Sequence, residues 1–273
     1  ATTLTSWTSD GFVVGVDDGV NANGENFASW NWKANGAGSA NTDGDINSTV
    51  SANTTSGFSI VNYTGTLSGS GNPTVGHGLG VAPQVMIIKS ASNGENWGVQ
   101  HTSLPANYLL QLNTTSAQIN SASQGTLTAP TSSVFTVNYS GEWGNSGQNY
   151  IAYCFAEKQG YSKMDSYTGN GNTNGTFVYT GFKPAYVIAK RTDGTSNWNQ
   201  FDNKRFGFNV KNPLLYPNLT NAEADDVFID LLSNGFKWRT TNGDINASGG
   251  SYIYMAFAEA PLVGTNNVPA NAR

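Results

Sequence analysis

Hydrophobic residues in this chain occur in runs of four to eight, and clusters of Gly, Asn, Ser and Thr separate the runs. Short runs divided by turn residues predict β-strands, and they favour an antiparallel sandwich or barrel over repeated βαβ units. In the first half of the chain the predicted strands are Phe58–Tyr63, Val85–Lys89, Leu109–Leu112, Val134–Val137 and Tyr150–Glu157. Only Asn221–Leu232 has apolar residues at helical spacing, and there we expect one or two helical turns.

Two of the apolar runs are nearly identical. YIAYCFAE (Tyr150–Glu157) and YIYMAFAE (Tyr252–Glu259) lie 102 residues apart. Further matches at offsets of 101 to 104 residues are Gly57–Ser59 with Gly160–Ser162, Tyr63–Gly65 with Tyr167–Gly169, Val81–Lys89 with Phe182–Lys190, and Ser133–Phe135 with Asn234–Phe236. So steady an offset indicates that a module of about 100 residues has been duplicated within the chain.

A partial third copy occupies the N-terminus. Its matches are Ser9–Phe12 with Ser233–Phe236, Asn21–Gly24 with Asn246–Gly249, and Phe27–Trp32 with Tyr252–Phe257. Residues 1–34 are therefore predicted to be the closing strands of a preceding copy, with Ala34 in the place of Glu259. Two explanations stay open. Either the chain is the C-terminal portion of a longer protein, which we favour, or these strands pair with a neighbour.

The predicted fold is all-β, with two tandem antiparallel β-sandwiches of the jelly-roll or concanavalin-like kind. We place the first sandwich at residues 57–158 and the second at residues 159–260, followed by a tail at residues 261–273. Residues 35–56 are rich in Gly, Asn, Ser and Thr, a composition that predicts an extended linker. Ile46 and Thr49–Val50 leave room there for a short edge strand.

The closing strand of each sandwich has two apolar faces. Ile151, Tyr153 and Phe155 alternate with the smaller Ala152 and Cys154. Because large side chains bury more area, we expect the large face to fill the sandwich core and the small face to lie under a loop or a neighbouring module.

Composition excludes several classes of protein. With 13 Lys and Arg residues and a net charge of −5, phosphate neutralisation on a nucleic acid is disfavoured. We expect no membrane span, because no apolar run approaches ~18 residues. We also expect no signal peptide. A single cysteine, Cys154, excludes an internal disulfide framework, and with 2 His the sequence predicts no metal site and no cofactor.

Aromatic residues are the best candidates for ligand contact, because an exposed Trp or Tyr can stack on a sugar ring. Trp97 and Trp198 follow the same Asn in both copies, which favours packing within the module, although glycan contact stays open. Trp143 and Trp238 are not shared between the copies. Together with Tyr139, they are the stronger candidates for a specific ligand site.

No catalytic arrangement stands out among the polar residues. Cys154 stands where the second copy has Ala256, so we expect a buried, inert thiol. The aspartates lie in turn-like contexts, and neither His77 nor His101 has a recognisable nucleophile or acid beside it.

Two further hypotheses concern charged residues. The oxygen-rich stretch Asp17–Glu25 suits calcium, but a plain polar hairpin is preferred. Equivalent strand ends suggest a repeated ion pair, Lys89 with Glu157 and Lys190 with Glu259.

Several long motifs resemble a known family. They are FASWNWKANG (Phe27–Gly36), VGHGLGVAP (Val75–Pro83), FVYTGF (Phe177–Phe182) and FAEAPLVG (Phe257–Gly264). These runs resemble the repeated C-terminal module of tail-fibre or virion-associated proteins of tailed bacteriophages, particularly marine phages and cyanophages. The resemblance covers residues 9–273 and brings no catalytic residues.

The resemblance implies a non-enzymatic structural protein on an external appendage of the virion, where it contacts other virion proteins and a host-surface glycan or protein receptor. By analogy with phage fibres, it also implies a homotrimer. Three alternatives are a capsid decoration protein, a fibre-borne polysaccharide-degrading enzyme with paired acids in one groove, and a secreted lectin, which the resemblance disfavours.

Overall fold

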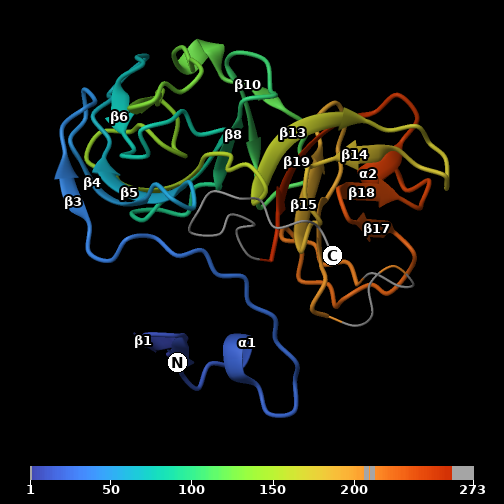
Figure 1. Ribbon diagram of the computed structural model, residues 1–273. Helices are drawn as coiled ribbons and strands as arrows, with labels where there is room; N and C mark the ends of the chain where they lie inside the picture. The colour runs from blue at the N-terminus through green and yellow to red at the C-terminus, as the bar shows by residue number, and fades with distance from the viewer. Residues whose placement is uncertain (1, 206–208, 210–212, 260–273) are drawn as a thin grey trace. The chain divides into compact units, whose positions relative to one another are not determined.

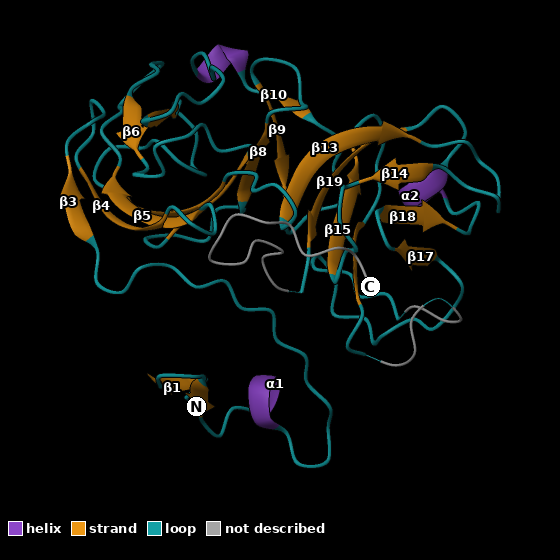
Figure 2. Cartoon of the chain, viewed as in Figure 1, coloured by secondary structure: helices purple, strands orange, loops and turns teal. Residues whose placement is uncertain are grey.

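Strands and loops make up nearly all of the computed structural model, which describes residues 2–205, 209 and 213–259 (Figure 2). The chain divides into two compact units, Ala1–Trp32 and Lys33–Arg273. The larger unit contains both predicted sandwiches, here called module 1 (residues 33–158) and module 2 (residues 159–259). All pairings between its named strands are antiparallel within the described residues, as the all-β prediction requires.

Module 1 is a two-layer sandwich. Its large sheet has the strand order β10-β9-β8-β7-β12-β5-β4-β3, and a small sheet, β11-β6, supplies the second layer (Figure 1). The strands are β3 (Ser39–Asn41), β4 (Ser48–Asn53), β5 (Phe58–Thr64), β6 (Thr74–Gly76), β7 (Val85–Ser90), β8 (Gly98–His101), β9 (Tyr108–Gln111), β10 (Ile119–Asn120), β11 (Val134–Thr136) and β12 (Asn149–Phe155). A 3₁₀ turn, η1, spans Ala122–Gln124.

Module 2 is built in the same way. A four-stranded sheet, β13-β19-β15-β16, faces a three-stranded sheet, β14-β18-β17. The elements are β13 (Ser162–Thr168), β14 (Phe177–Tyr179), β15 (Tyr186–Arg191), β16 (Trp198–Asp202), β17 (Ile229–Leu232), β18 (Gly235–Trp238), the one-turn helix α2 (Gly243–Asn246) and β19 (Ser251–Phe257). The predicted helical turns at Asn221–Leu232 are wrong, because β17 occupies the end of that segment and pairs with β18.

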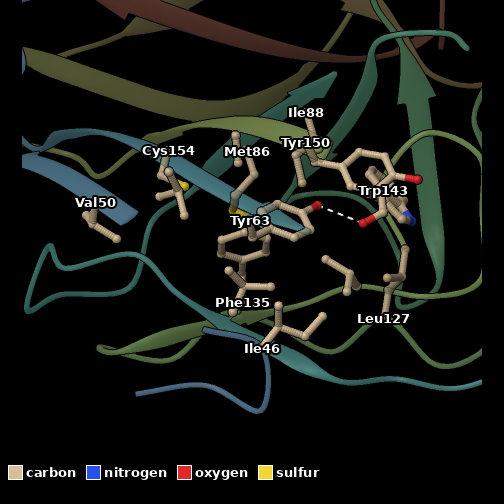
Figure 3. Packing of buried hydrophobic residues seen from close by; sticks show 14 of the residues in the cluster. Ile46, Val50, Tyr63, Met86, Ile88, Leu127, Phe135, Trp143, Tyr150 and Cys154 are labelled. Carbon is tan, nitrogen blue, oxygen red and sulfur yellow. Dashed lines mark hydrogen bonds between the residues drawn. The ribbon is translucent and has the colours of Figure 1, made fainter. Parts of the chain in front are cut away.

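The two modules share specific internal contacts. The Tyr63 hydroxyl donates to the backbone carbonyl of Trp143 at 2.7 Å (Figure 3), and Tyr167 donates to Ile245 in the same way at 2.8 Å. Tyr63 also stacks on Tyr150 of β12, with ring centroids 5.3 Å apart. Tyr167 stacks in the same way on Tyr252 of β19, with ring centroids 4.8 Å apart. These equivalent contacts support the interpretation that both modules follow one design.

The segment predicted to be a linker belongs to module 1. β4 pairs with β5 along its whole length, and β3 pairs with β4. Ile46 and Val50 are buried in the module 1 core (Figure 3). Thr49–Val50, where the sequence left room for a short edge strand, lies in β4, although β3 rather than β4 forms the edge. The polar composition misled the linker prediction, because a strand needs few apolar side chains when only one of its faces is covered.

The predicted orientation of the closing strand is also wrong. Ala152, Cys154 and Ala156 belong to the module 1 core, so Ile151, Tyr153 and Phe155 point to the opposite face. β19 has the same orientation, with Tyr252, Tyr254 and Ala256 in the module 2 core.

The outward apolar faces of the two large sheets pack against each other. This intermodule seam brings the rings of Phe155 and Phe257 to a centroid separation of 5.9 Å. The Trp198 indole donates to the backbone carbonyl of Gln111 at 2.9 Å, and two loops join through the Gln118 amide and the Thr192 carbonyl at 2.9 Å. Phe155 and Phe257 therefore stabilise the contact between modules rather than the core of either one.

The N-terminal unit is a hairpin followed by a short helix. β1 (Leu4–Trp7) pairs with β2 (Phe12–Val14), and α1 spans Asp18–Asn21. Strands were predicted throughout residues 1–34, but Phe27–Trp32, the expected counterpart of β19, is not assigned to a strand. The predicted tail at residues 261–273 lies outside the described residues.

Candidate functional site

An open groove lies on the surface of module 1. It lies over β4, β5 and β12 and has a volume of about 490 Å³. Its lining consists of strand residues and the ends of two loops, namely Ala40, Asn47, Ser48, Thr49, Asn62, Tyr63, Thr64, Ala91, Asn149, Tyr150 and Ile151. The groove is therefore built largely on hydrogen-bonded strands, which hold its side chains in fixed register.

Strand register brings the polar side chains of the groove together. Thr49 pairs with Asn62, and Asn62 pairs with Ile151, so these three residues form one row across the sheet. In the next row Thr64 donates to the Asn149 side chain at 2.9 Å. Because alternate residues of a strand share a face, both rows lie on the outward side of the large sheet.

The chemistry of the groove is neutral. Among the described residues that line it, none carries a formal charge at pH 7. The two tyrosines direct their hydroxyls into their own module, where Tyr63 donates to Trp143 and Tyr150 to the Gly141 carbonyl. Burial raises the pKa values of both phenols, so they stay protonated. Amides and hydroxyls remain to contact a ligand, and they suit a polar, uncharged one.

An aromatic pair lies on the same face as Ile151. Tyr153, two residues further along β12, stacks on Trp97 with a centroid distance of 6.4 Å and an interplanar angle of 13°. Both side chains are half-buried, so part of each ring is accessible. Of the predicted ligand-binding residues, Trp97 thus has the most suitable surroundings.

The structure does not support the other tryptophans as ligand contacts. Trp143 and Trp238 are fully buried, each within the core of its own module. Trp198 is buried in the intermodule seam. The prediction failed because a position that is not shared between the copies can differ for packing reasons alone. Tyr139 is exposed and stays a candidate, although it does not line the groove.

The predicted ion pairs are also wrong. The Lys89 ammonium donates to the backbone carbonyls of Asn93 and Glu95, and Glu157 forms an ion pair with Lys163 at 3.1 Å. In module 2, Lys190 donates to the carbonyls of Thr115 and Arg191, while Glu259 pairs with Lys204. Burial lowers the pKa of Lys190 to about 8.

The side chains considered as reactive groups, Cys154 and His77, are both buried. Cys154 is buried and free, and burial raises the pKa of its thiol to about 12. His77 contacts the Thr131 carbonyl at 3.2 Å, and burial lowers its pKa.

In the stretch considered for calcium, Asp17–Glu25, Asp17 caps α1 by accepting from the Gly19 amide. The plain hairpin expected there is therefore replaced by a capped helical turn.

The described residues contain neither a cluster of metal-ligating side chains nor a helix able to span a membrane. No group of three or more His, Cys, Asp and Glu side chains is placed to hold a metal ion. None of the helices has the length and apolar character that a membrane crossing requires.

Residues 1–261 match the family model described as "Domain of unknown function (DUF7483)". The chain belongs to this family. It is also 28% identical over 89 residues to lysosome-associated membrane glycoprotein 1 of Gallus gallus, a match that covers 33% of the chain and 22% of that glycoprotein. No solved structure matches the chain. The similarity to the glycoprotein spans less than one module and brings no function to the chain.

The sequence analysis missed the polar residues of the groove. Asn62 does lie within a predicted strand, between the apolar residues Val61 and Tyr63, and Asn149 directly precedes another predicted strand. That pattern indicates an outward-facing position. It could not show that three strands bring these positions into one groove, because strand order is not a local property.

Proposed function

We propose that this protein is a non-enzymatic structural and attachment protein of a bacteriophage virion, located on a tail fibre or other external appendage. In this proposal the module 1 groove binds a neutral host-surface glycan. The observation that carries the proposal is the row of amide and hydroxyl side chains on a rigid sheet, beside the stacked Trp97 and Tyr153. Sugar recognition commonly combines such polar groups with an aromatic face.

Two further observations support this function. The modules pack through an apolar seam and belong to one compact unit, which is compatible with an attachment structure that presents the groove on a folded body. The sequence motifs resemble tail-fibre and virion-associated modules, and assembly with other virion proteins as a homotrimer follows from that resemblance by analogy.

A glycan array probed with the full chain tests the proposal. Asn62→Arg, which places a long charged side chain in the groove, should reduce binding at least tenfold. Ser166 of β13 is the equivalent exposed position in module 2, since it pairs with Ile253 as Asn62 pairs with Ile151. Ser166→Arg is therefore the matched control and should leave binding unchanged. Equal effects of both substitutions, or no glycan binding by the native chain, would count against the groove.

The location on the virion needs a separate measurement. Antibody labelling of intact particles should mark the tail appendages. Labelling of the head lattice would instead favour the capsid decoration alternative, which requires no ligand groove. Breakdown of a polysaccharide by the purified chain would favour the enzyme alternative.

A further inference from the structure

Next to its turn, the N-terminal hairpin has the same pairing as the β17–β18 hairpin of module 2. In β1–β2, Trp7 pairs with Phe12 and Ser6 pairs with Val13, and the register shifts between Ser6 and Leu4. In β17–β18, Leu231 pairs with Phe236 and Asp230 pairs with Lys237. The turns match as well, since Ser9–Phe12 is the sequence counterpart of Ser233–Phe236.

The helix that follows each hairpin also matches. Asp17 caps α1 by accepting from a backbone amide at 2.9 Å, and Asn242 caps α2 in the same way at 2.8 Å. The last side chain of each helix then reaches back six residues. Asn21 donates to the Gly15 carbonyl and Asn246 donates to the Thr240 carbonyl, both at 2.8 Å.

A glycine with positive φ follows each helix three residues later, at Gly24 (φ 82°) and Gly249 (φ 74°). Both glycines adopt the left-handed conformation, which a side chain would disfavour. The hairpin, the helix and the glycine of the N-terminal unit thus match the corresponding part of module 2 in structure as well as in sequence, whereas Phe27–Trp32 does not form a strand as β19 does.

The N-terminal unit differs from module 2 in what covers the hairpin. Leu231, Phe236 and Trp238 are fully buried in the module 2 core. Two of their counterparts at the N-terminus are exposed, with Trp7 72% and Phe12 37% accessible, and the third, Val14, is half-buried. Large apolar side chains left so accessible on one hairpin mark a surface suited to a protein partner.

In module 2, the equivalent surface is covered by β14 and by the turn after β13. β14 pairs with β18, and the turn after β13 accepts two further bonds from the Asn246 amide, at Asn170 Oδ1 (3.1 Å) and the Asn172 carbonyl (2.9 Å). For Asn21, the hydrogen bonds found among the described residues end at Gly15. Among the described residues, the N-terminal unit therefore contains no counterparts of β13 and β14, which belong to the opening half of module 2.

We propose that the N-terminal unit is an acceptor completed by the opening strands of an equivalent module, supplied by a separate stretch of polypeptide. Both opening halves of this chain are already committed, because β5 and β7 pair with β12, while β13 and β15 pair with β19. The partner is accordingly a third opening segment with the strand pattern of β5 to β8, and strand addition is the mode of binding.

A fusion tests this inference. A second copy of residues 57–125, the opening segment of module 1, is placed ahead of the full chain through a flexible Gly/Ser linker, which raises the effective concentration of the donor. Hydrogen exchange followed by mass spectrometry should show at least tenfold slower exchange of the amides in β1 and β2. It should also show new protection at residues 27–32. Acrylamide quenching of Trp7 should fall, measured against a Trp7→Phe variant of the same fusion.

Two controls make the result decisive. A fusion with a scrambled donor should leave exchange in the N-terminal unit unchanged, and Phe12→Asp should abolish the protection gained with the native donor. In a second format, a synthetic peptide of residues 57–67 is added to the unfused chain and the same amides are followed. If neither the fusion nor the peptide slows exchange in β1 and β2 relative to the scrambled sequence, the inference is overturned.

Discussion

The imidazole of His101 in β8 lies 3.3 Å from the backbone carbonyl of Tyr254 in β19, so a module 1 side chain bonds to the central strand of module 2. Its other ring nitrogen, Nδ1, accepts from the Ser103 amide at 3.1 Å, which leaves the proton on the nitrogen that faces Tyr254. The equivalent position in module 2 is Asp202, which pairs with Arg205. A neutral histidine at the seam is thus specific to module 1.

Stability should fall as pH falls between about 6.5 and 4. Burial lowers the pKa of His101 from 6.5 to about 4, so in this range the unfolded chain binds a proton that the folded chain does not. The free energy of unfolding should decrease by about 3 kcal/mol across the window, an order-of-magnitude figure. Urea denaturation at a series of pH values measures this decrease.

His101→Gln is the variant that isolates this effect. His101→Gln should remove most of the decrease in the free energy of unfolding at low pH, because burial lowers the pKa of His101 to about 4. His77→Gln should remove less of this decrease, although burial also lowers the pKa of His77. An unchanged slope in His101→Gln would show that other groups control the pH dependence.

Trp143 should contribute to stability rather than to ligand binding. Trp143→Ala removes a fully buried ring and its indole bond to the Asn138 side chain, at 2.5 Å, and should lower the free energy of unfolding by about 3–5 kcal/mol. Trp97→Ala, at a half-buried position, should cost less stability and weaken glycan binding more. The measurements are urea denaturation and the glycan array, and the opposite ranking would contradict the assignment of both residues.

Each module core contains one tryptophan, but at different places. By the repeat alignment, Trp143 corresponds to Ile245, and Trp238 corresponds to Val137. All four side chains are fully buried, so the exchange keeps core volume similar. Trp238→Val and Ile245→Trp should each destabilise module 2. The double variant should be at least about 1 kcal/mol more stable than the sum of the two single losses in unfolding free energy predicts.

A double-mutant cycle by denaturation measures this coupling. Trp238→Val combined with Tyr139→Ala, a surface change in the other module, is the control and should be additive. Additive effects for Trp238 and Ile245 would show that the two positions do not compensate.

Gly249 should be required for its backbone conformation alone. Its φ is 74°, and an added Cβ would meet no atom within 4 Å. Gly249→Ala should therefore cost about 1 kcal/mol through the left-handed backbone. Gly243, in α2, has equal space for a Cβ without the positive φ, so Gly243→Ala should be neutral or slightly stabilising. Thermal unfolding of both variants checks this difference, and equal losses would refute it.

Local sequence patterns predicted much of this fold. The short apolar runs became strands, and Ser133–Phe135 and Asn234–Phe236 lie at or beside the equivalent strands β11 and β18. Such predictions succeed because strand alternation and turn residues act over a few neighbouring positions. At Asn221–Leu232 the helical spacing was overridden, because pairing with β18 and burial of Leu231 stabilise a strand instead.

The candidate site was predicted much less well than the fold. Of the five aromatic residues selected from the sequence, three are buried in a core or in the intermodule seam, Tyr139 is exposed, and Trp97 stacks on Tyr153 at a half-buried position. An indole that packs in a core and one that contacts a ligand look alike in a sequence. The distinction depends on what the opposite layer of the sandwich covers.

The sequence by itself determined the module, with its strands, its turns and the positions at which its copies agree, because these follow from side-chain size and backbone preference within a short stretch. Only the tertiary structure decided which apolar face of β12 and β19 points inward, and where Asn62 and Thr49 meet. Both faces of these strands are apolar, so burial alone cannot choose between them. The choice is made by the second module, whose packing provides a second surface away from water.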